Sequence, residues 1–197
     1  MGHLGEWLAR CREAGLELIA AAPVHGIGDV RPFGAASRAG VRIARLTVDG
    51  IGLDHVDLLR RAAEVQAAVG GLHTLAPLSS GTATLRTDVG TAGHDTPSTG
   101  YDDLKRVALA RLIADNIPSI QVNWTVYGPK LAQVALTFGA DDLDAVTPFD
   151  TLELGPRRAA LEEVRRNIEA AALEPAERNG RYEVIVAEAR LPPRPHR

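Results

Sequence analysis

The stretch YGPKLAQVALTFGADDLD, from Tyr127 to Asp144, decides the fold class of this chain. Its Gly128-Pro129 pair predicts the start of a helix, because proline at the first helical position sacrifices no hydrogen bond. Four apolar residues then follow at helical spacing and predict one buried face: Leu131, Val134, Ala135 and Phe138. Gly139 predicts the end of the helix, and 140–144 reads as a short strand. A helix that returns directly onto a strand is half of a βαβ unit, so the stretch predicts a parallel α/β sheet.

The same alternation extends along the rest of the chain. Strands are expected at 16–21, 41–48, 72–78, 119–125 and 140–144, with helices between them. An eight-stranded barrel needs about 250 residues, whereas this chain has 197. The sequence therefore predicts an α/β fold, a partial TIM-like (βα) barrel of about five parallel strands with flanking helices. We expect one domain over 1–188 and a Pro/Arg-rich, disordered tail over 189–197.

The composition excludes several classes of partner. A net charge of -3 gives no sign of the positively charged surface with which proteins bind nucleic acid or an anionic membrane. No apolar run approaches the roughly 20 residues that a membrane span needs, and the first residues lack the basic flank and apolar core of a signal peptide. We therefore expect a cytoplasmic protein that binds neither nucleic acid nor membrane.

Three runs of residues carry a resemblance to a known family. The first contains Trp124, Gly128, Lys130, Ala132, Gln133, Ala135, Leu136, Gly139, Ala140, Asp142 and Leu143. The second contains Thr99, Gly100, Asp102, Asp103, Leu104, Ala108, Ala110, Arg111, Leu112, Asp115, Asn116 and Pro118, and the third contains Pro175, Arg178 and Tyr182. Together they resemble the C-terminal half of the radical S-adenosylmethionine enzymes of the futalosine route to menaquinone. That family includes aminofutalosine synthase, dehypoxanthine futalosine cyclase and relatives that make the deazaflavin precursor.

Cysteine content separates the chain from a complete enzyme of that family. The resemblance implies S-adenosylmethionine and a 4Fe–4S cluster bound by a Cys-x-x-x-Cys-x-x-Cys motif, whose ligands are thiolates. The sequence holds one cysteine, Cys11, and no spacing of histidines and acidic residues that predicts another metal site. We therefore expect no cofactor on this chain alone, with S-adenosylmethionine and the cluster present only if a partner chain supplies the cluster.

Candidate ligand contacts come from two arguments. Alternation along 119–125 places Gln121 and Asn123 on one face of a strand, which in a parallel barrel faces the lumen. Chemistry in α/β barrels lies on the loops that follow the strands, which singles out Asp49, His94 and Asp144. Thr47 matches the residue with which the family ends its second strand here. Each of these residues also has a non-functional interpretation, because turn residues and loop histidines are more often simply solvated.

The sequence leaves three functions open. The chain is either a cluster-less relative that acts as a ligand-binding or accessory subunit, or the C-terminal piece of a split radical enzyme. A third, weaker option is a cluster-independent lyase or hydrolase that uses the loop 79–98. A five-stranded parallel sheet leaves two edges and an inner face to cover, so we expect either a homodimer or a second chain that completes the barrel, with a small molecule bound inside.

Overall fold

The structure is a computed structural model, and it describes residues 10–26, 31–38, 40–48, 54–78, 99–146 and 161–185. Its helices are η1 (Val24–Gly26), α2 (Arg31–Arg38), α3 (His55–Val69), α4 (Gly100–Ile113), α5 (Trp124–Thr137) and α6 (Leu161–Ala170). Its strands are β1 (Leu18–Ile19), β2 (Ala22–Pro23), β3 (Arg42–Ile43), β4 (Arg45–Thr47), β5 (Thr74–Ala76), β6 (Ser119–Asn123), β7 (Asp142–Asp144), β8 (Glu177–Arg178) and β9 (Val184–Ile185). The expected tail over 189–197 and the loop 79–98 lie outside the described residues.

The main sheet has five strands in the order β2-β4-β5-β6-β7, and every neighbouring pair is parallel. Strand β1 pairs with β3 in the same register in which β2 pairs with β4, since Leu18 lies opposite Arg42 and Ala22 opposite Leu46. Strands β1 and β2 are therefore two parts of one edge strand, and β3 and β4 two parts of its neighbour. The predicted α/β fold with five parallel strands is confirmed, and it is consistent with a partial TIM-like barrel.

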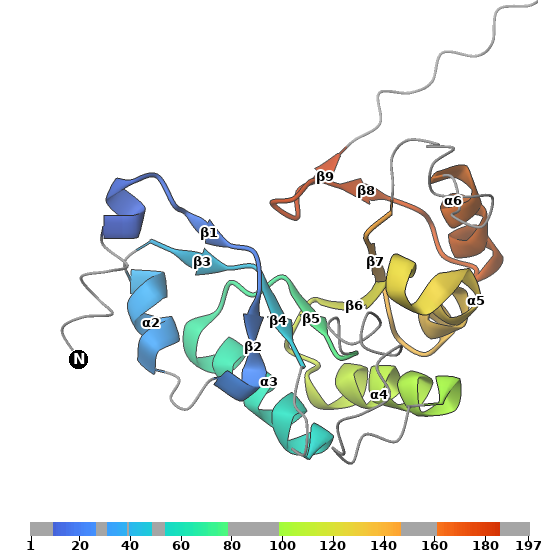
Figure 1. Cartoon of the computed structure of the whole chain (residues 1–197), viewed down its shortest axis with the longest axis horizontal. Coiled ribbons are helices and arrows are strands. Elements are labelled where there is room, and N and C mark those ends of the chain that lie inside the picture. The colour runs from blue at the N-terminus through green and yellow to red at the C-terminus, as the bar shows by residue number, and fades with distance from the viewer. Residues whose placement is uncertain are drawn as a thin grey trace, which may run out of the picture.

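The helices cover one face of this sheet. Figure 1 shows α3, α4 and α5 along the outside of the curved sheet and the β8–β9 hairpin on its opposite side. Outward-facing Leu46, Leu75 and Ile120 are fully buried and belong to one core with residues of the helices, such as Leu59 and Val107. Each such side chain contributes roughly 1.5–3 kcal/mol when it leaves water, so the outer layer holds the fold together.

Two glycines and two caps set the helix ends as the sequence indicates. Thr99 and Asp102 form a capping box at the start of α4, in which each side chain accepts from the other residue's backbone N–H. Asp54 caps α3 by accepting from the N–H groups of the first turn. Positive φ angles at Gly70 and Gly139 end α3 and α5. None of the described helices is long and apolar enough to cross a membrane.

The central stretch differs from its prediction in two ways. The strand before it ends at Asn123 rather than at Thr125, because the Asn123 side chain accepts from the N–H of Val126 and caps a helix that begins at Trp124. Within α5, Gly128 has a non-helical φ of 77° and separates two helical segments, so a helical segment does begin at Pro129 as predicted.

The second difference is in which residues of α5 are buried. The buried residues of its second half are Ala132, Ala135 and Leu136, whereas Val134 and Phe138 are exposed. The predicted apolar face was therefore half wrong: Leu131 and Ala135 contact the core, but the buried face is turned towards Ala132 and Leu136 and away from Val134 and Phe138.

Candidate functional site

The inner face of the sheet, opposite the helices, is polar. Strand alternation and the register place one set of side chains on this face: Arg45, Thr47, Thr74, Ser119, Gln121, Asn123, Asp142 and Asp144. The outer face of the same strands carries Leu46, Leu75, Ile120 and Val122 in the core. A barrel strand that turns charged residues inward is built to meet a ligand or a water-filled lumen, because buried charges need partners.

Gln121 is the centre of this polar face. Its side chain is 2% exposed, its Oε1 accepts from Arg45 Nη1 at 2.6 Å, and its Nε2 donates to Asp142 Oδ2 at 2.8 Å. The same Arg45 Nη1 donates to Asp144 Oδ2 at 2.6 Å. The Gln121 amide therefore fixes Arg45 of β4 relative to Asp142 of β7, and Arg45 in turn holds Asp144.

The C-terminal hairpin closes this network from the open side. The Arg178 guanidinium binds Asp142 through Nε at 3.0 Å and Nη2 at 2.7 Å, which is a two-point charged hydrogen bond. The guanidinium carbon also lies 4.1 Å from the centre of the Tyr182 ring, and that ring stacks on His73 at 5.3 Å with an interplanar angle of 6°. The hairpin thus rests on Asp142 of β7 and on His73, the residue before β5.

Tyr182 is held in an uncommon conformation. Its φ is 66°, a left-handed value that is rare for a bulky residue and costs about 1–3 kcal/mol. Burial raises the pKa of its phenol, and the charges of Arg178 and Arg45 together with a hydrogen bond to Gln121 offset part of that rise. The phenol is therefore neutral at physiological pH, and its hydroxyl faces the same network.

Arg45 is incompletely satisfied. Its Nε is buried and has no hydrogen-bond partner among the described residues, although Nη1 has two. Its side chain is 24% exposed and that of Asp144 is 34% exposed, so this pair is reached from the open face. An unpaired N–H of a positioned guanidinium can donate to an anionic or carbonyl oxygen.

The structure brings three of the predicted site residues together. Thr47, Gln121 and Asp144 share the inner face, and Thr47 is 7% exposed. Asn123 lies on the same face, but its side chain caps α5. Asp49 and His94 lie outside the described residues, so their placement stays a prediction.

Sequence reasoning missed Arg45, Asp142, Arg178 and Tyr182. The alternation used for Gln121 could have found the first two, since Arg45 precedes Thr47 by two residues and Asp142 precedes Asp144 by two. Arg178 and Tyr182 were identified in a family motif but were not assigned to the site, because nothing in the sequence says which strands a distant hairpin contacts.

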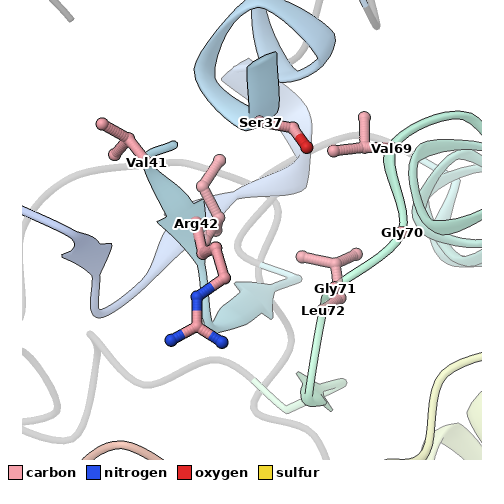
Figure 2. A pocket seen from close by; sticks show the side chains of 8 residues that line it. Ser37, Val41, Arg42, Val69, Gly70, Gly71 and Leu72 are labelled. Carbon is pink, nitrogen blue, oxygen red and sulfur yellow. The ribbon is translucent and has the colours of Figure 1, made fainter. Parts of the chain in front are cut away.

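A separate cavity of about 240 Å³ lies at the opposite end of the strands, between β3 and the segment that links α3 to β5. Figure 2 shows Val69 and Leu72 on one side of it and Val41 and Arg42 on the other. The lining is mainly apolar. It lies near the amino ends of the strands, where conserved features of such barrels serve stability rather than chemistry, so we place the candidate site on the inner face.

The described residues contain no group of three or more His, Cys, Asp or Glu side chains that could hold a metal ion. Cys11 is partly buried, and no described cysteine pairs with it.

The environment of His55 leads us to expect that the protein loses stability in mild acid. Burial lowers the pKa of His55, and the charge of Arg106 lowers it further, against a hydrogen bond to the Arg106 backbone and the charge of Asp54. The folded protein therefore holds a neutral His55, whereas the unfolded chain binds a proton near pH 6.5. Stability is full above that pH and falls as the pH drops from about 6.5 through the lower pKa of the folded state.

Urea unfolding at pH 7.5 and at pH 5.0 measures this dependence. We expect a lower midpoint at pH 5.0 for the wild type and a smaller drop for His55→Gln, which cannot titrate. An equal drop in wild type and His55→Gln would show that other groups cause it.

Comparison with known proteins gives two findings. The family model described as "CofH/MqnC C-terminal region" matches residues 79–190. The chain is also similar to aminodeoxyfutalosine synthases of Streptomyces coelicolor, with 38% identity over 45% of this chain and 24% of the relative, and of Thermus thermophilus, with 33% identity over 68% and 36%. The chain is also similar to the cyclic dehypoxanthine futalosine synthase of Streptomyces coelicolor, with 27% identity over 88% of this chain and 46% of the relative. The chain thus spans less than half of the length of each of these three proteins.

Proposed function

Because this chain belongs to the family of the CofH/MqnC C-terminal region, we propose that it acts as a ligand-binding accessory subunit that contributes the C-terminal strands of a barrel. One observation carries the proposal: the inner face of the sheet is polar and internally organised, while its outer face is an ordinary apolar core. A protein with only a structural role would gain more from an apolar inner face, because buried charged pairs add little net stability.

The ligand that this face suits is small, polar and rich in hydrogen-bonding groups. Arg45 offers donors, Asp144 offers an acceptor, and both are partly exposed. The Thr47 hydroxyl lies on the same face, and no hydrogen bond links it to the described residues. Because two of the relatives are aminodeoxyfutalosine synthases, aminodeoxyfutalosine is the first probe.

Titration calorimetry with aminodeoxyfutalosine tests this proposal. We expect saturable binding by the wild-type chain and about tenfold weaker binding by Thr47→Val, which keeps the shape and removes one hydrogen-bonding group. Thr137→Val is the matched control, because Thr137 is exposed near the end of α5 and its hydroxyl bonds only the backbone of Val134. Absence of binding by the wild type, or equal loss in both variants, would contradict the ligand role.

The 4Fe–4S cluster of the wider family does not fit the residues of this chain. Such a cluster needs at least three thiolates, and the sequence has one cysteine. The described residues also lack any cluster of alternative ligands. No step of radical chemistry is therefore assigned to this chain.

A second candidate is the C-terminal part of a split radical enzyme. It rests on the match of residues 79–190 to the C-terminal region of the family. In that case a separate polypeptide supplies the cluster and S-adenosylmethionine. Native mass spectrometry of the chain, purified by affinity from its host without oxygen, decides the question: a complex that contains iron and sulfide supports the split enzyme, and an iron-free monomer or homodimer excludes it under these conditions.

A further inference from the structure

The outer surface of α4 carries large apolar side chains that face solvent. Tyr101 and Leu112 are 77% and 75% exposed, although α4 packs between α3 and α5 on the outside of the sheet (Figure 1). Together with Lys105 and Ala108 they follow the spacing i, i+4, i+7 and i+11, which places all four on one stripe of the helix. The buried residues of α4 lie on its opposite side, so this α4 stripe is free to meet another molecule.

The end of α5 adds to this apolar surface. Arg111 of α4 donates from Nε to the carbonyl oxygen of Gly139 at 2.8 Å, so the ends of α4 and α5 lie side by side. Phe138 and Val134 of α5 are 46% and 41% exposed. Because Leu112 and Phe138 adjoin the two bonded residues in the sequence, they lie on neighbouring parts of the surface. Exposed apolar side chains that gather in this way mark sites of protein association.

The charges along the α4 stripe are opposite at its two ends. Lys105 lies towards the start of α4, and Asp115 lies in the turn that follows its end. Both are exposed, and within the described part of the chain neither belongs to an ion pair. Leu112 lies between them. Such a surface is complementary to a copy of itself turned end over end, because each charge then meets its opposite.

We propose that the chain forms a homodimer in which α4 of one copy packs antiparallel on α4 of the other, about a two-fold axis level with Ala110. In a two-fold contact, a residue before the axis meets the residue that lies equally far after it. Lys105 therefore meets Asp115 of the second copy. Leu112 packs on Ala108 of the second copy, whose small side chain lets the two helices approach closely.

The same two-fold operation sets α5 against α5. Gly139 bonds Arg111, which adjoins the axis, so the exposed Phe138 side chains of the two copies pack on each other near it. Tyr101 lies further from the axis and meets the exposed turn that follows α4 of the second copy. This dimer is independent of the ligand role proposed above, because α4 covers the outer face of the sheet and the polar network lies on the inner face.

A charge swap tests the arrangement, because the two charges that meet belong to different copies. Lys105→Glu sets two negative charges against each other, and Asp115→Lys sets two positive ones. Each single variant should dimerise about tenfold more weakly than the wild type, whereas the double variant restores opposite charges and should regain most of the affinity. Leu112→Ser, which removes the central apolar contact, should also weaken the dimer about tenfold.

Sedimentation equilibrium of the full chain measures the dimer dissociation constant, and the urea midpoint of each variant verifies folding. Glu169→Lys, at an exposed position of α6, is the matched control and should leave the constant within about twofold of the wild type. A monomeric wild type would overturn the proposal. A dimer that withstands Leu112→Ser and both single charge variants would overturn it by placing the contact elsewhere. Failure of the double variant to regain affinity would show that the two charges do not meet, which overturns the antiparallel arrangement.

Discussion

Replacing Asp142 with alanine is expected to lower the free energy of unfolding by about 3 kcal/mol. The Asp142 side chain is 10% exposed, and it accepts from Arg178 twice and from Gln121 once. Alanine leaves a largely buried guanidinium and a buried amide without their acceptor, which costs more than the net value of the pair. We place the effect at the lower end of the range for buried pairs because Arg178 is 26% exposed.

Urea unfolding followed by the fluorescence of buried Trp124 measures this effect. Asp57→Ala is the matched control, because Asp57 forms an ion pair with Arg60 in which both side chains are largely exposed. We expect the control to lose no more than about 1 kcal/mol, the combined scale of a surface pair and a first-turn charge. Similar losses in both variants would mean that Asp142 contributes no more than a surface charge.

The same substitution reports on the hairpin. Strands β8 and β9 have two residues each, and a hairpin of that size is not stable alone. Its attachment relies on Arg178 and on the stacking of Tyr182 on His73. A peptide that spans the hairpin should therefore exchange faster in Asp142→Ala than in the wild type, at labelling times at which exchange in β6 is still unchanged.

The fold was predictable from the sequence because its signals are local. A period of two in the strands, a period near 3.6 in the helices, and caps such as Thr99 with Asp102 each depend on residues within one element. Five parallel strands in sequential order follow from their alternation with helices. The predicted strand 119–125 ran too far for a local reason as well. The Asn123 side chain caps a helix that begins at Trp124, but in the sequence Asn123 looks like one more residue of the alternating strand.

The site was predictable only where it lies on strands. Alternation placed Gln121 on the inner face, and the register then placed Asp142 opposite it. The contact from Arg178 spans 36 residues, and no periodic pattern encodes a contact of that separation. Asp49 and His94 remain predictions, since their argument rests on the position of loops after strands.

Replacing Gly139 with alanine is expected to destabilise the fold by about 3 kcal/mol. The φ of Gly139 is +106°, a region that costs side-chain-bearing residues about 1–2 kcal/mol. A Cβ here would also lie 2.9 Å from Arg111 Cβ and 3.0 Å from its Cγ, and relief of such overlap costs about 1–3 kcal/mol. Arg111 has little freedom to move, because it bonds the carbonyls of Gly139 and Pro118 and pairs with Asp141.

Gly70→Ala separates the backbone cost from the overlap. Gly70 also has a positive φ, +66°, but nothing lies within 4 Å of the position of its Cβ, so only the conformational cost of about 1–3 kcal/mol applies. Parallel urea titrations of the two variants should therefore show a larger loss for Gly139→Ala than for Gly70→Ala, because only Gly139→Ala adds an overlap with Arg111. Equal losses would show that Arg111 moves aside freely, and the three contacts by which it ties α4 to the residues before β6 and β7 would then contribute little to the fold.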